Sequence, residues 1–267
     1  MKDLNGRLAL VTGSATGLGR SIAVKLAERG AEIFVNCARS LEEGQQTVAL
    51  CEAAGAKAAL IQADVSTAEG CATLAEGIGA GGRLDILVNN AGITRHARDH
   101  GDLNALSRDD FMDIYAVNVV GPFLCLQALK PLLLAAEAVS GRPSVVLNTS
   151  SIAGTTGIGS SVAYAASKGA LNTMTLSLAR GLAPQIRVNA ICPGFIGTRW
   201  FKDAMDEATF EKTVRGVEAS TPLGVASGPD DIADAALFFL TDASRHVTGE
   251  TLHVDAGLHL GYSPLKA

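Results

Sequence analysis

Several features that mark other classes of protein are scarce or absent in this chain of 267 residues. Its 22 Lys and Arg are outnumbered by 27 Asp and Glu, which gives a formal charge of -5. The basic residues are scattered along the chain and form no run. A nucleic-acid partner requires a basic face that meets phosphates, and an anionic membrane attracts clustered basic residues. We therefore expect neither nucleic acid nor a membrane among its partners.

Disulfide and metal-binding patterns are missing as well. The chain has five widely spaced cysteines and no Cys-x-x-Cys pair: Cys37, Cys51, Cys71, Cys125 and Cys192. An odd number at wide spacing is typical of reduced, buried thiols in a cytoplasmic protein. His96 and His100 are four residues apart, but the His-Glu-x-x-His pattern is absent, and the segment has the composition of a loop. We expect no metal site.

Long hydrophobic runs are few. The apolar run near the N-terminus has the length of a strand and is too short for a secretory signal. Residues 114–129 are interrupted by Asn118, Gln127 and the pair Gly121-Pro122, and residues 144–167 are crowded with Ser, Thr and Gly. The first is too short for a membrane-spanning helix, and the second is long enough but too polar, so we expect neither to span a bilayer. These observations predict a soluble protein.

The remaining composition is that of a protein with a large core, since 48% of the residues are hydrophobic and 18% are charged. Short apolar runs typical of buried parallel strands occur at 7–12, 32–36, 58–62, 84–88, 144–148, 186–191 and 251–254. Helical patterns lie between them at 21–29, 41–54, 67–80, 108–139 (interrupted or bent near Gly121-Pro122) and 162–182. This alternation predicts an α/β fold, a doubly wound parallel sheet of about seven strands with helices on both faces. No linker or repeat is visible, so we expect one domain over residues 1–267.

A glycine-rich turn follows the first predicted strand. It reads Thr12-Gly13-Ser14-Ala15-Thr16-Gly17-Leu18-Gly19 and opens directly into a helix. Glycines allow a tight turn and a close approach of the backbone to pyrophosphate, and the helix N-terminus supplies N–H donors and a positive dipole end. The strand–turn–helix context favours dinucleotide binding. A turn without a ligand is the alternative.

The chain resembles the short-chain dehydrogenase/reductase family along nearly its whole length. The glycine turn has that family's Thr-Gly-x-x-x-Gly-x-Gly spacing. Further motifs of the family follow in order: Asp64-Val65, Asn89-Asn90-Ala91-Gly92, Asn118, Ser150-Ser151, Tyr164-x-x-x-Lys168 and Pro193-Gly194. The resemblance implies a Rossmann fold and an oxidoreductase that transfers a hydride between a nicotinamide cofactor and a carbonyl or alcohol carbon.

Four residues are the candidate catalytic set. Tyr164 and Lys168 are i, i+4 on a predicted helix and share a face. A neighbouring cation stabilises a phenolate, so we expect Lys168 to lower the pKa of Tyr164 from its usual value of about 10 and to make it a proton donor or acceptor. Ser151, thirteen positions earlier, can hydrogen-bond the substrate oxygen. By resemblance, Asn118 bends its helix and holds a water leading to Lys168. Its simpler role is to satisfy a broken helix backbone.

The family resemblance also assigns the cofactor contacts. Asp64 and Val65 would contact adenine, Lys168 the nicotinamide ribose, and the segment after Pro193 the nicotinamide carboxamide. The full predicted set is Gly13, Ser14, Thr16, Gly17, Leu18, Gly19, Arg39, Ser40, Asp64, Val65, Asn90, Ala91, Gly92, Tyr164, Lys168, Pro193, Gly194, Ile196 and Thr198.

The second strand bears on which dinucleotide is bound. NAD-specific relatives place an acid after it to bind the ribose 2′-hydroxyl, but this chain reads Asn36-Cys37-Ala38-Arg39-Ser40. Arg39 can pair with a 2′-phosphate, helped by Ser14 and Ser40, although Thr16 stands where many NADP-dependent relatives carry a basic residue. We favour NADP(H) and keep NAD(H), with Arg39 as a plain surface charge, as the alternative.

Residues 198–220 hold Trp200, Phe201, Met205 and Phe210 amid charges, which suits a lid over the substrate or an amphipathic surface helix. The general pattern resembles bacterial 3-oxoacyl-carrier-protein reductases, and sugar, polyol and steroid dehydrogenases share it. The charged loop at 95–100 either favours an anionic substrate or is a solvated cluster. The helices at 108–139 and 162–182 are rich in Leu, Ala and Val, and the family buries such helices between subunits, so we expect a homotetramer or homodimer.

Three other functions have different requirements. A non-catalytic dinucleotide sensor would keep the fold without needing Ser151, Tyr164 and Lys168 together. A sugar-nucleotide epimerase would show Thr-Gly-x-x-Gly-x-x-Gly, and a serine hydrolase would show Gly-x-Ser-x-Gly. Neither of these two patterns is present.

Overall fold

The computed structural model describes residues 2–79, 82–97, 99–202 and 205–261. Arg98 of the charged loop and the side chain of Phe201 in the predicted lid lie outside this description. One seven-stranded sheet has the order β3-β2-β1-β4-β5-β6-β7, and every pairing is parallel. The strands are β1 (Leu8–Val11), β2 (Glu32–Cys37), β3 (Ala58–Gln62), β4 (Ile86–Asn89), β5 (Ser144–Thr149), β6 (Ile186–Pro193) and β7 (Thr251–Val254). The predicted fold class is confirmed.

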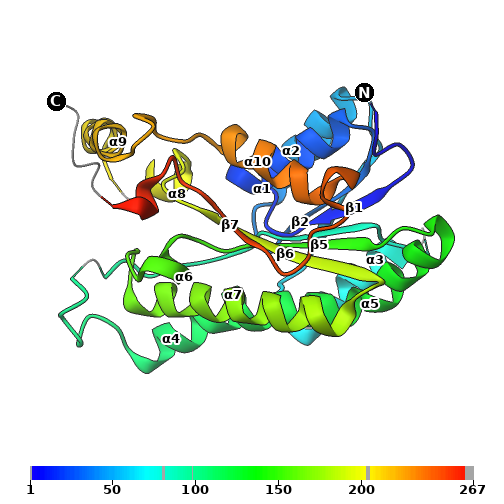
Figure 1. Ribbon diagram of the computed structural model, residues 1–267, viewed down its shortest axis with the longest axis horizontal. Helices are drawn as coiled ribbons and strands as arrows, with labels where there is room; N and C mark the ends of the chain where they lie inside the picture. Colours follow the sequence, from blue (N-terminus) through cyan, green and yellow to red (C-terminus); the bar gives the residue numbers. More distant parts are fainter. Residues whose placement is uncertain (1, 80–81, 98, 203–204, 262–267) are drawn as a thin grey trace.

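Helices cover both faces of the sheet, so the molecule has three layers (Figure 1). One face carries α1 (Gly17–Glu28), α2 (Leu41–Ala53) and α10 (Pro229–Leu240). The other carries α3 (Ala68–Ile78), α4 (Arg108–Tyr115), α5 (Gly121–Ser140) and α7 (Val162–Leu182). The central strands β1, β4, β5 and β6 are buried almost throughout because both of their faces are covered.

The order of the strands determines where a ligand binds. β2 and β3 lie on one side of β1, and β4 to β7 lie on the other, so the chain reverses its direction of travel between β1 and β4. In open parallel sheets, ligands bind beyond the carboxyl ends of the strands at this switch point. The glycine turn follows β1, and the Asn-Asn-Ala-Gly motif follows β4, so the two predicted motifs meet there.

Helix α10 was not predicted from the sequence. Its signal was present: Asp231 accepts a hydrogen bond from the N–H of Gly228 at 2.7 Å, which caps the helix start. Ile232, Ala236 and Leu240 follow at helical spacing and are fully buried against α1 and the sheet. Together these residues form the third helix on that face, between β6 and β7.

Of the interruption or bend predicted near Gly121-Pro122, the structure shows no interruption: a π-helical turn lies just before this pair. The helix continues from α4 through a π-segment (Ala116–Val120) into α5. Pro122 has no N–H to donate, and the wider turn accommodates the lost bond. The stretch Arg108–Ser140 is therefore long and apolar enough to cross a membrane by length and composition, with 39% of the apolar window buried. The helix itself was predicted over 108–139, but its apolar stretch is longer than the 114–129 run considered from the sequence. The absence of a membrane span stays a prediction.

The segment predicted as a lid forms two helices, α8 (Arg199–Lys202) and α9 (Glu207–Ser220), beyond the carboxyl ends of the strands (Figure 1). None of the residues of α9 is buried. Asp206 caps this helix by accepting a hydrogen bond from the N–H of Thr209 at 2.8 Å. The remaining elements are α6 (Ala153–Thr156) and short 3₁₀ turns at Asp242–Ser244 and Leu258–Leu260.

Candidate active site

A cavity of about 1150 Å³ runs along the carboxyl edge of the sheet, from the end of β2 to the lid. All the predicted site residues except Ser14 and Asn118 line it. They are Gly13, Thr16, Gly17, Leu18, Gly19, Arg39, Ser40, Asp64, Val65, Asn90, Ala91, Gly92, Ser151, Tyr164, Lys168, Pro193, Gly194, Ile196 and Thr198. Residues spread over most of the chain therefore surround one space.

The glycine turn is held by buried amides. Asn36, on β2, accepts a hydrogen bond from the N–H of Gly13 at 3.2 Å and donates to the carbonyls of Ile61 and Ala63, both at 3.1 Å. Asn90 donates to the carbonyl of Gly13 at 3.1 Å. A Cβ on Gly13, whose φ is +60°, would lie 2.8 Å from the Cα of Ala91. Only glycine therefore lets the β1 and β4 turns approach this closely.

The N-terminus of α1 opens on the cavity. Its cap residue, Thr16, makes no side-chain hydrogen bond to the helix, and the first turn carries no acidic residue. The first amides of a helix have no partner within the helix, so these N–H groups are available to an anion. A Cβ on Gly17 would meet only the Thr198 side chain, at 3.6 Å. The turn therefore fits the pyrophosphate of a dinucleotide.

The predicted contribution of Ser14 to the 2′-phosphate site is wrong. The Ser14 side chain is fully buried, donates to the carbonyl of Val11 at 2.7 Å and accepts from the N–H of Asn36 at 3.0 Å. The turn folds this hydroxyl back between β1 and β2, away from the cavity. Ser14 thus joins two strands.

The end of the cavity beside β2 and β3 retains the other polar residues predicted there. Arg39 is exposed, and Ser40 begins α2 without using its hydroxyl as a cap. Asp64 accepts hydrogen bonds from the hydroxyl and the N–H of Ser66, at 2.7 and 2.9 Å, which lower the pKa of its carboxyl. Arg39 adds an attractive charge to the same carboxyl.

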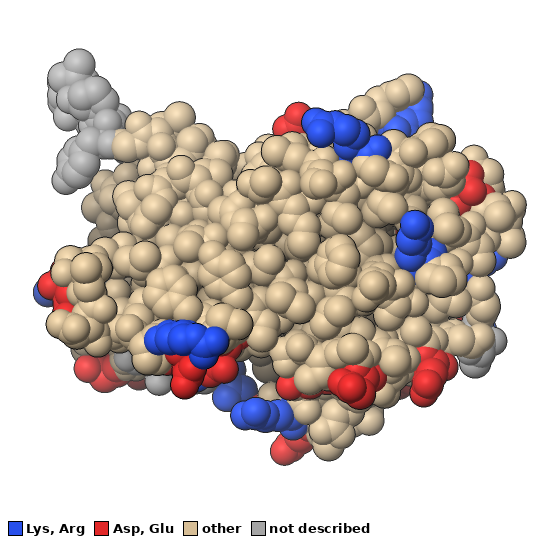
Figure 2. Space-filling view, turned by 90° about the horizontal axis from the view of Figure 1, so that it is seen from below, with Lys and Arg blue, Asp and Glu red and all other residues tan. Residues whose placement is uncertain are grey.

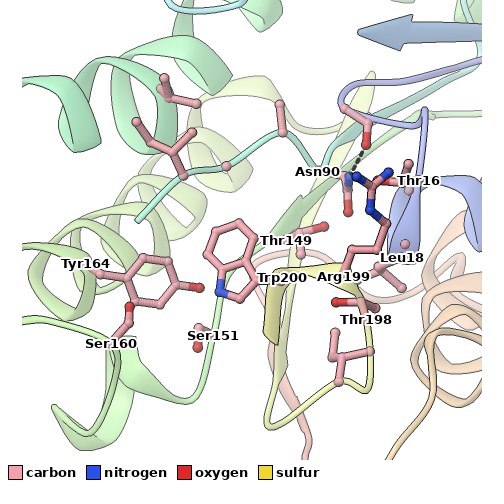
Figure 3. Close-up of a pocket in the computed structure, with 18 of the residues that line it drawn as sticks. Thr16, Leu18, Asn90, Thr149, Ser151, Ser160, Tyr164, Thr198, Arg199 and Trp200 are labelled. Carbon is pink, nitrogen blue, oxygen red and sulfur yellow. Dashed lines mark hydrogen bonds between the residues drawn. The ribbon is translucent and has the colours of Figure 1, made fainter. Parts of the chain in front are cut away.

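Tyr164 and Ser151 lie together at the other end of the cavity (Figure 3). α7 begins at Ser161, whose hydroxyl accepts from the N–H of Tyr164 at 3.2 Å and so fixes the first turn. Burial raises the pKa of Tyr164 to about 12, and the hydrogen bond from Ser151 offsets only part of this rise. The expectation that Lys168 lowers this pKa below 10 is therefore wrong for the cofactor-free site. Desolvation of the phenolate outweighs the neighbouring groups.

Lys168 is 3% exposed, and its ammonium donates to the carbonyl of Thr149 at 2.8 Å. Its Nζ lies 5.7 Å from the centre of the Tyr164 ring. Burial lowers the pKa of Lys168 to about 8. The hydroxyl of Thr149, which also lines the cavity, is buried and has no hydrogen-bond partner. Thr149 was not predicted as a site residue from the sequence. Its unsatisfied hydroxyl can bind a polar ligand beside Lys168.

Asn118 lies in the π-segment and is fully buried behind the cavity. Its amide accepts from the N–H of Ile93 at 2.9 Å, donates to the carbonyl of Ile93 at 3.0 Å and donates to Ser167 at 3.1 Å. Ser167 in turn donates to the carbonyl of Tyr164 at 2.7 Å. Asn118 therefore links the loop after β4 to α7, and the backbone groups that its side chain satisfies belong to that loop and not, as the simpler expectation had it, to its own helix.

The Pro193-Gly194 turn closes the same end of the cavity. The carbonyl of Pro193 accepts from the N–H of Ile152 at 3.0 Å, so the turn is tied to the segment that carries Ser151. A Cβ on Gly194 would lie 2.7 Å from the Cβ of Asp255, which only glycine avoids. Thr198 and Ile196 follow on the wall, with the N–H of Thr198 bound to the carbonyl of Ile196 at 2.7 Å.

The segment predicted as a lid places several side chains in the cavity. Arg199, to which the sequence analysis gave no role, lies next to Thr198 and pairs with Glu43 of α2 at 3.1 Å. Trp200 contacts Tyr164 inside the cavity, with ring centres 6.1 Å apart and ring planes tilted by 54° (Figure 3). Met205 of the predicted lid lines the cavity, and Phe210 packs on Phe195 at 6.3 Å. Lid residues thus contribute to the site, although the closing motion stays a prediction.

In the charged loop, Arg95 lines the cavity but is paired with Asp110 at 3.2 Å and Asp113 at 3.4 Å. His96 also lines the cavity. The pairing favours the solvated charge cluster over an anion-binding role for Arg95. The five cysteines are free and buried, as expected. No group of His, Cys, Asp and Glu that could hold a metal is present among the described residues.

Proteins of similar sequence and structure are reductases, which agrees with the features of this cavity. The family model described as Enoyl-(Acyl carrier protein) reductase matches residues 13–259. A protein of Streptomyces violaceoruber, named as a ketoacyl reductase of the granaticin polyketide synthase, is 41% identical over 95% of this chain and 96% of its own length. The 3-oxoacyl-[acyl-carrier-protein] reductase FabG of Staphylococcus aureus is 35% identical over 94% of this chain and 98% of its own.

A solved structure gives the same result. The Pseudomonas aeruginosa RhlG/NADP active-site complex superposes with a TM-score of 0.87 at 33% identity, covering 97% of this chain and 98% of that one. The family model spans most of the chain, and the relatives match over nearly their full lengths. The chain therefore belongs to the short-chain dehydrogenase/reductase family and is an oxidoreductase that acts on CH–OH and C=O groups.

Proposed function

We propose that this protein is an NADP(H)-dependent carbonyl reductase in which Tyr164 delivers the proton to the substrate oxygen. The observation that carries the proposal is the convergence of Tyr164, Ser151 and Lys168 at one end of a cavity whose other end is the glycine turn. The whole chain forms one catalytic domain, with residues 198–220 as its lid.

The protonation state of Tyr164 is compatible with reduction. Because burial raises its pKa in the cofactor-free site, Tyr164 is a neutral phenol at neutral pH and holds the proton that reduction consumes. Ser151 donates a hydrogen bond to the carbonyl oxygen and stabilises the negative charge that develops there. A reduced nicotinamide, held by the glycine turn and by Lys168, would supply the hydride to the carbonyl carbon. The oxygen then takes the Tyr164 proton, and the product is the alcohol.

Lys168 and Asn118 have different roles in this proposal. The buried ammonium of Lys168 lies between the carbonyl of Thr149 and the ring of Tyr164, where it can bind the nicotinamide ribose and stabilise the phenolate after proton transfer. Asn118 is a positioning residue, because its amide holds the loop after β4 and, through Ser167, the first turn of α7.

NADP(H) is proposed over NAD(H) because β2 is followed by Arg39 and Ser40 and by no acidic residue that would accept the ribose 2′-hydroxyl. Arg39 is exposed at the cavity wall, where a 2′-phosphate can reach its guanidinium. The relative that has been solved as an NADP complex supports this preference. NADH is expected to bind more weakly than NADPH.

The substrate is proposed to be a small ketone or a ketoacyl group, since two of the relatives are named as ketoacyl reductases. The test is a panel of ketones, ketoacyl thioesters and sugars, scored by loss of reduced nicotinamide with NADPH and with NADH. Reduction of ketones with NADPH preferred is the expected result. Turnover of sugars alone would make the protein a sugar or polyol dehydrogenase. Tight dinucleotide binding without turnover on any substrate would make it a sensor.

Self-association is part of the proposal. The face formed by α4, α5 and α7 has few charges, and most of them lie near its rim (Figure 2). Four apolar side chains on α4, the π-segment and α5 are 44–69% exposed: Met112, Val120, Phe123 and Val139. Burying such a surface favours association, so we propose a homotetramer, or a homodimer, that uses this face. The free, buried cysteines suit a reducing compartment, and a cytoplasmic location is proposed on that basis.

A further inference from the structure

Arg199 carries a positive charge from the lid to the glycine turn. It is the first residue of α8, and its guanidinium is paired with Glu43 of α2, with 3.1 Å between Nη1 and Oε1. In Figure 3 its side chain extends past Thr198 towards Thr16. No step of the hydride and proton transfer proposed above uses this arginine.

Two contacts define the path of this side chain across the start of α1. On the lid side, a Cβ on Gly17 would lie 3.6 Å from the Thr198 side chain, so the residue before Arg199 lies directly on the glycine turn. On the other side, Arg20 of α1 donates to the carbonyl of Glu43 at 3.1 Å, which holds Glu43 beside the same helix. A side chain that joins the lid to Glu43 therefore crosses the first turn of α1.

A second, smaller pocket of about 310 Å³ shows which part of the cofactor site Arg199 faces. Arg199, Thr16 and Gly17 line both this pocket and the large cavity. Arg39 and Ser40 line the large cavity but not the small pocket. Arg199 thus lies where the two spaces meet at the N-terminus of α1, and not at the end of β2, where the 2′-phosphate is proposed to bind.

The charges at this position suit an anion. The first turn of α1 carries no acidic residue, and the N-cap Thr16 makes no side-chain hydrogen bond to it, so the helix presents N–H groups and a positive dipole end. Arg199 adds a full positive charge beside them. A guanidinium has five N–H donors and can bind a carboxylate and a phosphate together. The pair with Glu43 is therefore compatible with a second, anionic partner.

We propose that Arg199 binds the pyrophosphate of the dinucleotide from the lid side, opposite the N-terminus of α1, and that Glu43 positions its guanidinium. This inference rests on the proposed function, because it assigns a further binding residue to the same site. Arg199 contacts the part of the cofactor that NADPH and NADH share, whereas Arg39 contacts the 2′-phosphate alone. Dinucleotide binding thereby holds α8, which also carries Trp200, over the cavity.

The test measures binding and needs no turnover. Dissociation constants for NADPH and NADH are determined by titration of nicotinamide fluorescence, and those for ADP and adenosine by competition with NADPH. The variants are Arg199→Met, which removes the charge, and Arg199→Lys, which keeps it. Arg215→Met is the matched control, since Arg215 is an arginine of α9 that pairs with Glu211 at 3.5 Å and does not line the cavity.

Arg199→Met should weaken the binding of NADPH, NADH and ADP by a similar factor. We expect about three- to tenfold, less than a buried contact to a charged group contributes, because the arginine side chain is 60% exposed. Adenosine has no phosphate and should bind as it does to the parent. Arg199→Lys should keep most of the ADP affinity, and Arg215→Met should match the parent for every ligand. Added salt should weaken ADP binding more in the parent than in Arg199→Met.

Glu43→Gln separates a contact with phosphate from a purely structural pairing. If Arg199 only held the lid against α2, removal of either partner would cost the same affinity. Glu43→Gln leaves the guanidinium in place, keeps an oxygen that it can bind, and removes a carboxylate that repels phosphate. ADP affinity in Glu43→Gln should therefore be higher than in the parent or within about twofold of it.

Several results would overturn the inference. A loss confined to NADPH would assign Arg199 to the 2′-phosphate instead. Equal losses for ADP and adenosine, unchanged affinities in Arg199→Met, or a loss in Glu43→Gln as large as that in Arg199→Met would each reject the pyrophosphate contact. The parent protein separates these results from failure of the proposed function, because a parent that binds neither NADPH nor NADH would reject the dinucleotide site itself.

Discussion

The buried ammonium of Lys168 predicts a specific dependence of stability on pH. The pKa of Lys168 falls from its ordinary 10.5 to about 8 because the charged form loses its hydration. Between pH 8 and 10.5 the unfolded chain therefore holds a proton on this group that the folded chain has released. Stability rises with pH wherever the unfolded state binds more protons. The folded cofactor-free protein should thus gain stability, relative to a variant without this amine, as pH rises through that window.

The size of the effect follows from the two pKa values. At about 1.4 kcal/mol for each pH unit, the fall from 10.5 to about 8 corresponds to about 3 kcal/mol. The perturbation is Lys168→Met, which keeps the length of the side chain and removes the amine. That change also removes the hydrogen bond to Thr149, but this loss contributes nearly equally at each pH and cancels when the pH dependence is compared.

The assay is urea unfolding of the parent and of Lys168→Met without cofactor at pH 7, 8.5 and 10. The difference in free energy of unfolding between them should shift in favour of the parent by about 2–3 kcal/mol from pH 7 to pH 10. Lys57→Met, which replaces a lysine whose side chain is 86% exposed, is the control and should show little such shift. A difference that is constant with pH would refute the reasoning, and so would one that moves the other way.

Three further predictions concern the other proposed contacts. Arg39→Asp should lower NADPH affinity at least tenfold, since a hydrogen bond to a charged group contributes about 1.5–3 kcal/mol, and should leave NADH affinity little changed. Both affinities are measured by calorimetry, with Ser14→Ala as the control. An unchanged ratio of NADPH affinity to NADH affinity would make Arg39 a plain surface charge. Ser151→Ala should lower kcat by about 10²-fold with nearly normal dinucleotide affinity, because its partner is the substrate oxygen; a loss of dinucleotide affinity of the same size would assign Ser151 to the cofactor instead. Phe123→Asp should reduce the mass measured by light scattering from that of a multimer, because it places a charge on the proposed contact face; a parent protein that already has the mass of one chain at micromolar concentration would reject the assembly.

Much of the fold is predictable because strong local patterns and global packing agree. The predicted helix 162–182 matches α7 residue for residue, since Ser161 caps it and a long Ala- and Leu-rich stretch follows. The strands are apolar runs because both faces of the sheet are covered. α10 was missed because the strand–helix alternation was not extended beyond the lid, although the capping Asp231 and the buried spacing of Ile232 and Ala236 were present.

The residues that line the site could be predicted from the sequence, but the burial of their side chains and the directions in which they point could not. Motif order placed Tyr164, Ser151 and Lys168 together. Spacing alone could not show that Ser14 turns inward between β1 and β2, because the direction of a side chain in a tight turn depends on the strands it joins. The pKa of Tyr164 was misjudged for a related reason: the sequence shows a cation one turn away but does not show how deeply both groups are buried. Trp200 reaches Tyr164 only through the path of the lid.

The central claim is that Tyr164 is the proton donor, and Tyr164→Phe tests it most directly because it removes only the hydroxyl. The measurement is turnover of a ketone together with NADPH affinity, determined by fluorescence, for the parent and the variant. A positioned acid contributes about 10²–10⁴-fold, so kcat should fall by that factor while NADPH affinity stays within about twofold. A Tyr164→Phe protein that binds NADPH normally and reduces the ketone at the parent rate would contradict the mechanism.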